Sequence, residues 1–254
     1  MLNNTEKEYI NHLVEFLPER RAGKRGPKPV EKGTLVTQLY KKFKHGLRWR
    51  DLEHATVCHN YFSELQRRGE FKNYLNFQTK KFKKVRQAKT IVDSSDMESY
   101  KTNNLVAYSG KYHNDCIKMT IEITPEYIPI NFCLSKGTEP DSKVIDEMLI
   151  HNQKLPYELF LDKGYEKYER RRDLKKQNCQ VRLEMKKIDK SRKKGPRFVF
   201  TQEHRKLRGE IEKVYSWLKS FVGIKFNRLK KKSLIMAKFI FCLSYIAFTQ
   251  LKKL

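Results

Sequence analysis

Two short apolar runs, each followed directly by an aspartate, constrain the fold of this chain more than any other feature. Residues 90–92 are β-branched and lead into Asp93, and residues 158–161 lead into Asp162. Runs this short that end in a polar residue predict buried strands rather than helices. The sequence therefore predicts a sheet that delivers carboxylates at its strand ends, and strands that lie side by side would bring the two aspartates together.

The segment between these two runs predicts further strands of the same sheet. Residues 117–123 alternate apolar and polar side chains, and residues 128–134 follow after a Pro-Glu turn, which indicates a hairpin. Helical patterns at 142–151 and 169–176 flank the second aspartate run. This order predicts an α/β fold with a mixed sheet covered by helices.

A third acidic residue lies on a predicted helix, the stretch 208–219 with the sequence RGEIEKVYSWLK. At 3.6 residues per turn, Arg208, Glu212 and Lys219 share one face. Four apolar residues form a neighbouring stripe that would pack against the sheet: Ile211, Val214, Tyr215 and Leu218. A salt-bridged surface helix has the same pattern, and the two upstream aspartates favour a functional site instead.

Asp93, Asp162 and Glu212 are the predicted metal ligands and catalytic residues. Three gathered carboxylates repel one another unless a divalent cation lies among them, and hard oxygen ligands suit Mg²⁺ or Mn²⁺. Two such ions can activate a water or a 3′-hydroxyl for attack on a phosphodiester. Asp96 is an alternative to Asp93, which we favour because it directly follows the apolar run. Glu210 is an alternative to Glu212, which keeps the spacing to both cations.

The charge balance predicts a polyanionic partner. The chain has 55 Lys and Arg against 29 Asp and Glu, a net charge of +26, which favours nucleic acid. Its five cysteines form no CxxC pair, so they predict neither a zinc ribbon nor a disulfide framework. The N-terminus lacks the pattern of a signal peptide. The apolar run 234–251 is interrupted by polar residues, which indicates a core helix that packs against the sheet rather than a membrane span.

The N-terminal third predicts a helical region. Apolar spacing indicates one helix over 34–43 that Gly46 can end, and another that starts near residue 55 and stops at Gly69. Two short helices joined by a turn suit a helix-turn-helix, although a plain helical subdomain has the same pattern. We predict a helical DNA-binding region over 1–85 and a catalytic domain over 86–254. Basic segments at 19–32, 184–197 and 226–232 would lie on the DNA backbone.

Three stretches, IVDSS at 91–95, LDKGYE at 161–166 and RGEIEKVYSWLKSF at 208–221, resemble the motifs of a known family. They are similar to those of DDE transposases of small bacterial insertion sequences, in the insertion-sequence four/five superfamily. The spacing Arg-x3-Glu-x6-Lys is matched in full, whereas Arg205 stands where the family usually has Tyr. The segment around Gly137 and Asp141 also resembles a loop-Asp stretch of these proteins.

The resemblance implies an RNase H-like core and a DNA transposase that cleaves at the element ends and transfers the 3′-hydroxyl strand into target DNA. It implies that the residues at positions 205, 208 and 219 handle DNA ends. We therefore expect Lys163, Arg208 and Lys219 to position phosphates and Arg205 to be a further DNA contact. Arg228 is expected to contact DNA as part of the basic patch 226–232. The partners would be double-stranded DNA, with terminal inverted repeats and a target, and a second copy of the chain. The expected place is the bacterial cytoplasm, at the nucleoid. The alternatives are a non-catalytic DNA-binding protein, such as a decayed or domesticated transposase, and a nuclease of the same fold.

Overall fold

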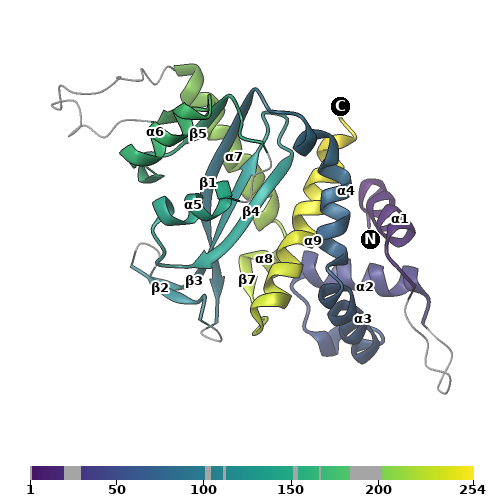
Figure 1. Ribbon diagram of the computed structural model, residues 1–254. Coiled ribbons are helices and arrows are strands. Elements are labelled where there is room, and N and C mark those ends of the chain that lie inside the picture. Colours follow the sequence, from purple (N-terminus) through teal and green to yellow (C-terminus); the bar gives the residue numbers. More distant parts are fainter. Residues whose placement is uncertain are drawn as a thin grey trace. The chain divides into compact units, whose positions relative to one another are not determined.

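The computed structural model groups the chain into two compact units, Met1–Gln78 with Trp217–Leu254, and Thr79–Ser216. The structure describes residues 2–19, 30–100, 104–110, 113–150, 154–165, 167–183 and 202–254 (Figure 1). One boundary between the units falls after Gln78, and the domain bounds 1–85 and 86–254 stay a prediction. The C-terminal segment differs from expectation, because its apolar helix groups with the N-terminal helices and not with the sheet.

The unit Thr79–Ser216 contains a mixed sheet, as predicted. Its strand order is β2-β3-β1-β5-β6, with β4 paired to β3. β1 runs antiparallel to β3 and parallel to β5, and β5 runs parallel to β6. The strands are β1 Lys89–Ser99, β2 Ala107–Ser109, β3 Asn114–Ile123, β4 Pro129–Lys136, β5 Glu158–Leu161 and β6 Gln180–Leu183.

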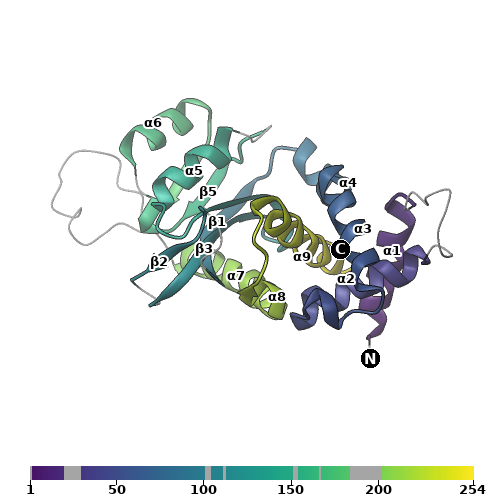
Figure 2. The same ribbon diagram turned by 90° about the horizontal axis from the view of Figure 1, so that it is seen from below.

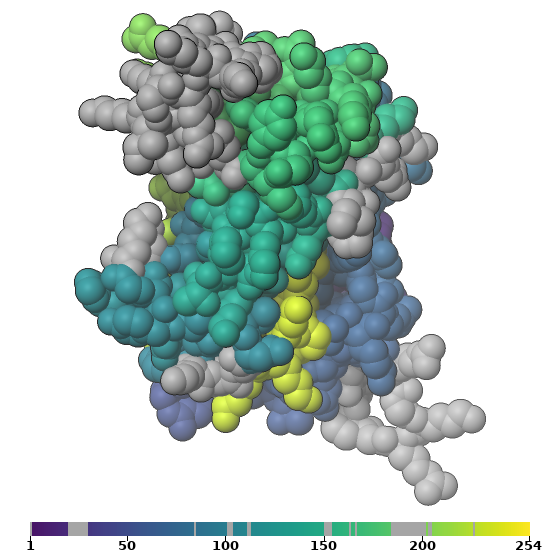
Figure 3. All heavy atoms as spheres, turned by 60° about the vertical axis from the view of Figure 1, so that its left-hand side comes forward, coloured from purple at the N-terminus to yellow at the C-terminus, as the bar shows by residue number. Residues whose placement is uncertain are grey.

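Helices cover both faces of this sheet. Figure 2 shows α5 (Asp141–Ile150) and α6 (Tyr168–Lys176) on one face and α7 (Gln202–Lys219) on the other. Val92, Val144 and Leu161 belong to the apolar core under α5 and α6. In Figure 3 the green atoms of α6 lie against the teal atoms of α5. Arg170 of α6 donates a hydrogen bond of 2.6 Å to Asp146 of α5. The elements therefore form the three layers of an RNase H-like fold.

β1 does not end at Val92, as the apolar pattern predicts, but continues to Ser99. Residues 93–98 stay paired with β3 through the register that runs from Asp93 opposite Ile121 to Glu98 opposite Cys116. Pairing with β5 does stop there, since its last pair is Val92 with Leu161. The apolar run therefore marks where β1 pairs with β5, and its polar continuation lies beyond the end of that pairing. The short strands β2 and β6 were not predicted.

The other unit is helical, and its predicted helices are confirmed. Gly46 and Gly69 follow α2 and α3 with φ of 66° and 71°, the left-handed conformation typical of helix C-caps. Its elements are α1 Asn4–Phe16, α2 Lys32–His45, η1 Trp49–Asp51, α3 Ala55–Arg67, the first part of α4 Glu70–Lys84, α8 Val222–Lys225, β7 Phe226–Asn227 and α9 Lys232–Leu251. α9 is long and apolar enough to cross a membrane by length and composition, but most of it is buried inside the structure. Tyr9 fixes it to α1 by a hydrogen bond of 3.1 Å to the carbonyl of Phe241.

Candidate active site

The sheet places Asp93 and Asp162 next to each other. Val92 of β1 is paired with Leu161 of β5 in parallel register, and each is followed directly by its aspartate. The predicted adjacency of the two strands is therefore confirmed. Because side chains alternate along a strand, Val92 points into the core under α5 and α6, and Asp93 points to the face that α7 covers.

Asp93 is a carboxylate in an unfavourable environment for its charge. Burial is the main reason that the pKa of Asp93 rises to about 6, and the negative charges of Asp162 and Asp141 raise it further. A hydrogen bond of 2.8 Å from the Ser94 amide and the positive charge of Arg208 act in the opposite direction. A further cation beside Asp93 would therefore stabilise the ionised site.

Arg208 of α7 is the cation that the structure brings to this pair. Its Nη1 lies 3.6 Å from Oδ1 of Asp162. Its Nε is buried and has no hydrogen-bond partner among the groups that the structure describes. Arg208 was predicted to contact phosphate, and here it partly neutralises the two aspartates.

Asp141 is a third carboxylate near the pair, and the sequence reasoning gave it no role. Lys118 of β3 donates a hydrogen bond of 2.7 Å to its Oδ1. A Cβ placed on Gly164, in the turn η2 (Lys163–Tyr165) after Asp162, would lie 3.1 Å from its Oδ2. Asp141 opens α5, where an acidic residue is common at a helix N-terminus. The one sequence signal that marks it is the resemblance of its segment to a loop-Asp stretch of the transposases.

Glu212 lies on an exposed part of α7, one turn beyond Arg208. Within the described ranges, no group of three His, Cys, Asp or Glu side chains is close enough to hold a metal ion. The structure thus brings together two of the three predicted ligands, and the third stays a prediction. Two other residues are the alternative candidates as metal ligands. Glu210 accepts hydrogen bonds from Tyr127 and Lys213. Asp96 contacts the Cys116 thiol.

Hydrogen bonds made by two tyrosines link the motif stretches of the site to one another, and the sequence did not predict these bonds. The hydroxyl of Tyr165, in the LDKGY stretch, lies 2.5 Å from Oγ of Ser94, in the IVDSS stretch. The hydroxyl of Tyr215, on α7, donates hydrogen bonds of 2.5 Å to the carbonyl of Asp93 and 3.1 Å to that of Met119. These bonds fix the backbone that carries Asp93 from both faces of the sheet.

Three of the other predicted DNA contacts are exposed. Arg205 is exposed on α7. Lys219 and Arg228 are exposed in the other compact unit. The side chain of Lys163 and the basic stretch 184–197 lie outside the described residues. Their roles in DNA binding stay predictions.

The donor set of Asp93 and Asp162 fits a divalent cation. Both side chains offer hard carboxylate oxygens. Burial raises the pKa of Asp93 to about 6 and the charge of Asp162 raises it further, so a cation at this position would favour the ionised form. Glu212, on the next turn after the arginine that reaches Asp162, would add a third oxygen ligand. The residues present therefore fit Mg²⁺ or Mn²⁺ better than a soft metal.

The family model described as "Transposase DDE domain" matches residues 86–247, which is more than half of the chain. The chain therefore belongs to the family of transposases with a DDE domain, whose members generally use a divalent metal. Searches of curated proteins and of solved structures found no match.

Proposed function

We propose that this protein is a metal-dependent DNA transposase that cuts at the ends of its element and joins the freed 3′-hydroxyl to target DNA. The observation that carries this proposal is the parallel pairing of β1 and β5, which places Asp93 beside Asp162. The match to the transposase DDE domain supports the same reaction class. The net charge of +26 supports double-stranded DNA as the substrate.

Asp93, Asp162 and Glu212 would hold the metal ions, which supply activation of the attacking oxygen and stabilisation of the leaving oxygen. Arg208 lies against Asp162. Once the charge of the carboxylates is neutralised, its guanidinium would be available to bind a phosphate of the DNA. Tyr215 and Tyr165 hold the strand that carries Asp93 in place. Lys163, Arg205, Lys219 and Arg228 would bind the DNA backbone, and a second copy of the chain would hold the other end of the element. The reaction would take place in the cytoplasm, at the nucleoid.

The test is a joining assay with purified protein, Mg²⁺ or Mn²⁺, and DNA that carries the inverted repeats flanking the gene. Asp162→Asn and Glu212→Gln should each abolish joined products while DNA binding in a gel-shift assay persists. Glu210→Gln is the matched control, because Glu210 is held by Tyr127 and Lys213. Wild-type protein that neither nicks nor joins this DNA would contradict the proposal.

One observation favours a second candidate, a DNA-binding protein without catalysis. Glu212 is exposed and completes no three-carboxylate group within the described ranges. Such a protein would bind the inverted repeats with an affinity that Glu212→Gln leaves unchanged and would yield no product. A nuclease of the same fold would instead cleave without joining, which the same gel distinguishes.

A further inference from the structure

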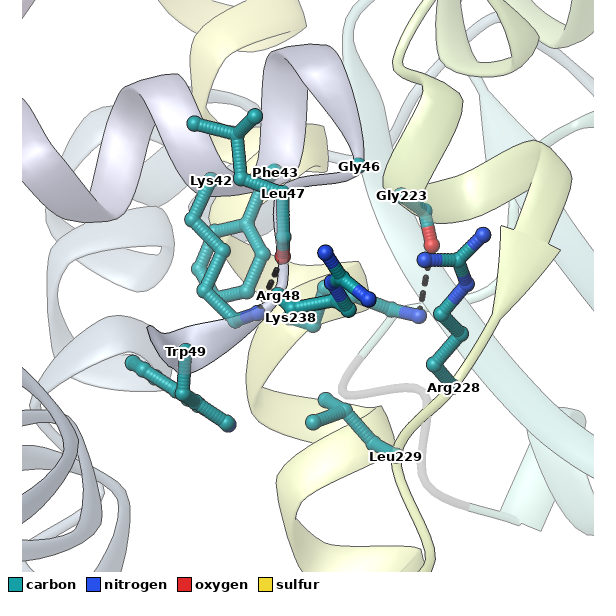
Figure 4. A pocket seen from close by; sticks show the side chains of 10 residues that line it. All are labelled: Lys42, Phe43, Gly46, Leu47, Arg48, Trp49, Gly223, Arg228, Leu229 and Lys238. Carbon is teal, nitrogen blue, oxygen red and sulfur yellow. Dashed lines mark hydrogen bonds between the residues drawn. The ribbon is translucent and has the colours of Figure 1, made fainter. Parts of the chain in front are cut away.

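A basic pocket lies in the helical unit, and none of its lining residues is proposed to be catalytic. It has a volume of about 180 Å³ and is lined by residues of α2, the turn into η1, α8, the segment after β7, and α9 (Figure 4). Four of its lining residues are cations: Lys42, Arg48, Arg228 and Lys238. None of the lining residues that the structure describes is acidic. The pocket therefore gathers positive charge with no carboxylate inside it.

Two of the four cations are buried within the pocket wall. Nζ of Lys42 donates a hydrogen bond of 2.6 Å to the carbonyl of Leu47 and lies 4.2 Å from the centre of the Trp49 ring. Nζ of Lys238 donates hydrogen bonds of 2.7 Å to the carbonyl of Gly223 and 2.6 Å to Oδ1 of Asn227. Their partners inside the wall are neutral oxygens and an aromatic ring, so the charge of each amine is left without a counterion there.

This burial lowers the pKa values of both amines. Burial lowers the pKa of Lys42 to about 8, and the nearby charge of Arg228 lowers it further, against the opposing charge of Asp51. Burial also lowers the pKa of Lys238 to about 7. An anion in the pocket would favour the charged form of both amines.

The other two cations lie at the exposed side of the pocket. Nε of Arg48 is 3.1 Å from Asp51, which leaves the rest of its guanidinium available. Arg228 is exposed and makes no hydrogen bond or ion pair within the described residues. Figure 4 shows the side chains of Arg48, Arg228 and Lys238 directed toward the same space. Two forked guanidinium groups suit the several oxygens of a phosphate.

The pocket wall is built by a close approach of two backbone segments. A Cβ on Gly46, which ends α2, would lie 2.7 Å from Cγ1 of Val222. A Cβ on Gly223 would lie 2.8 Å from the carbonyl oxygen of Phe43. Glycine at both positions lets α8 lie against the end of α2, so the pocket does not depend on a ligand for its shape.

We propose that this pocket binds a phosphate group, with Arg48 and Arg228 as the donors and Lys42 and Lys238 as the buried charges. Its volume is about six times the roughly 30 Å³ that one water occupies, which leaves room for a phosphate and part of its sugar. The phosphate can come from a DNA backbone or from a free phosphate compound. The DNA source rests on the proposed function, whereas the chemistry of the pocket does not.

The test follows Trp49 emission in a Trp217→Phe background during titration with inorganic phosphate and, separately, with a short DNA duplex at several salt concentrations. Both should give saturable changes. Arg48→Ala with Arg228→Ala should weaken phosphate binding at least tenfold and should lower the slope of log affinity against log salt by about 1. The matched control is Lys7→Ala with Lys72→Ala, which removes the same charge from exposed positions of the same unit.

Each outcome separates the two proposals. An unchanged Trp49 signal with both titrants, or a pocket variant that behaves as the control does, would overturn the phosphate pocket. Phosphate binding without a change in the DNA salt slope would assign the pocket to free phosphate compounds and overturn its role on DNA. A protein with an intact pocket response but no strand joining would count against the transposase reaction alone.

Discussion

Arg208 of α7 lies with its Nη1 3.6 Å from Oδ1 of Asp162, the aspartate that the sheet places beside Asp93. A cation from one layer of the fold thus faces two carboxylates from another. The same position is where a metal ion would bring its charge. Arg208 and a metal ion would therefore compete for the same pair of aspartates, and this competition can be measured.

Replacing Arg208 by glutamine should lower the stability of the protein in the absence of metal and raise its affinity for metal. Asp93 and Asp162 lose the positive charge against them, so the free energy of unfolding in EDTA should fall by about 1–2 kcal/mol. Affinity for Mn²⁺, measured by calorimetry, should rise because no guanidinium competes. Arg205→Gln, an exposed cation on the same helix, is the control. Equal Mn²⁺ affinity in Arg208→Gln and wild type would contradict this account.

Asp93→Asn should stabilise the metal-free protein and remove its response to metal. The substitution takes away a buried negative charge whose pKa is raised to about 6, so the unfolding temperature in EDTA should increase. Mg²⁺ should then raise that temperature in wild type and not in the variant, which differential scanning fluorimetry can follow. Glu126→Gln changes an exposed carboxylate of the same unit and should match wild type. A variant that still responds to Mg²⁺ as wild type does would exclude Asp93 as a ligand.

Tyr215→Phe should slow strand cleavage without changing DNA affinity. The phenyl ring keeps the packing, but the bonds to the carbonyls of Asp93 and Met119 are lost, at a stability cost of about 1 kcal/mol. A looser backbone at Asp93 should lower the cleavage rate about tenfold at saturating DNA. Tyr127→Phe removes a hydroxyl bonded to Glu210 and serves as the control. A variant with an unchanged rate would show that Tyr215 is needed for packing alone.

Lys238 should make the stability of the protein increase with pH. Its pKa falls from 10.5 to about 7 in the folded state, so between these values the unfolded chain binds the extra proton. Stability then rises as the pH increases from about 7 to 9, by at most about 1.4 kcal/mol per pH unit. Lys238→Met should have a shallower slope in urea unfolding, whereas Lys72→Met, at an exposed position, should keep it. Parallel slopes in Lys238→Met and wild type would show that Lys238 stays charged when buried.

Two glycine-to-alanine substitutions should have effects of opposite sign. Gly46 has φ of +66° and no room for a Cβ beside Val222, so Gly46→Ala should destabilise the protein by about 1–3 kcal/mol. Gly209 lies inside α7 with nothing within 4 Å of a Cβ, so Gly209→Ala should stabilise it by about 0.5–1 kcal/mol. Urea unfolding at one pH compares them. A neutral Gly46→Ala would mean that α2 and α8 separate easily.

The sequence predicts the fold correctly where a local run of apolar residues marks a buried segment. The bounds of β5 are predicted correctly. The two apolar runs that lead into Asp93 and Asp162 are predicted as strands that can be adjacent, and the sheet pairs them. The end of β1 is predicted wrongly because pairing to β3 continues through residues that show no apolar pattern. Strand pairing depends on partners far along the chain, which a local window does not contain.

The contacts of the candidate site are less accessible to sequence reasoning. The bond between Ser94 and Tyr165 joins residues 71 positions apart, and that between Lys118 and Asp141 joins residues 23 apart. Each depends on strand register and on which face of a helix is turned inward. Residue type and spacing alone determine neither the strand register nor the inward face of the helix. The position of Glu212 relative to the two aspartates remains a prediction for the same reason.

The helical unit is assembled from both ends of the chain, Met1–Gln78 and Trp217–Leu254. A nascent polypeptide cannot complete this unit until α9 has left the ribosome, because α1 is bonded to α9 through Tyr9. The sheet with its paired aspartates, by contrast, is encoded in one uninterrupted stretch that emerges earlier. During synthesis, the carboxylate pair can therefore form before the basic pocket exists, because α9 is translated after every strand that carries or flanks the pair.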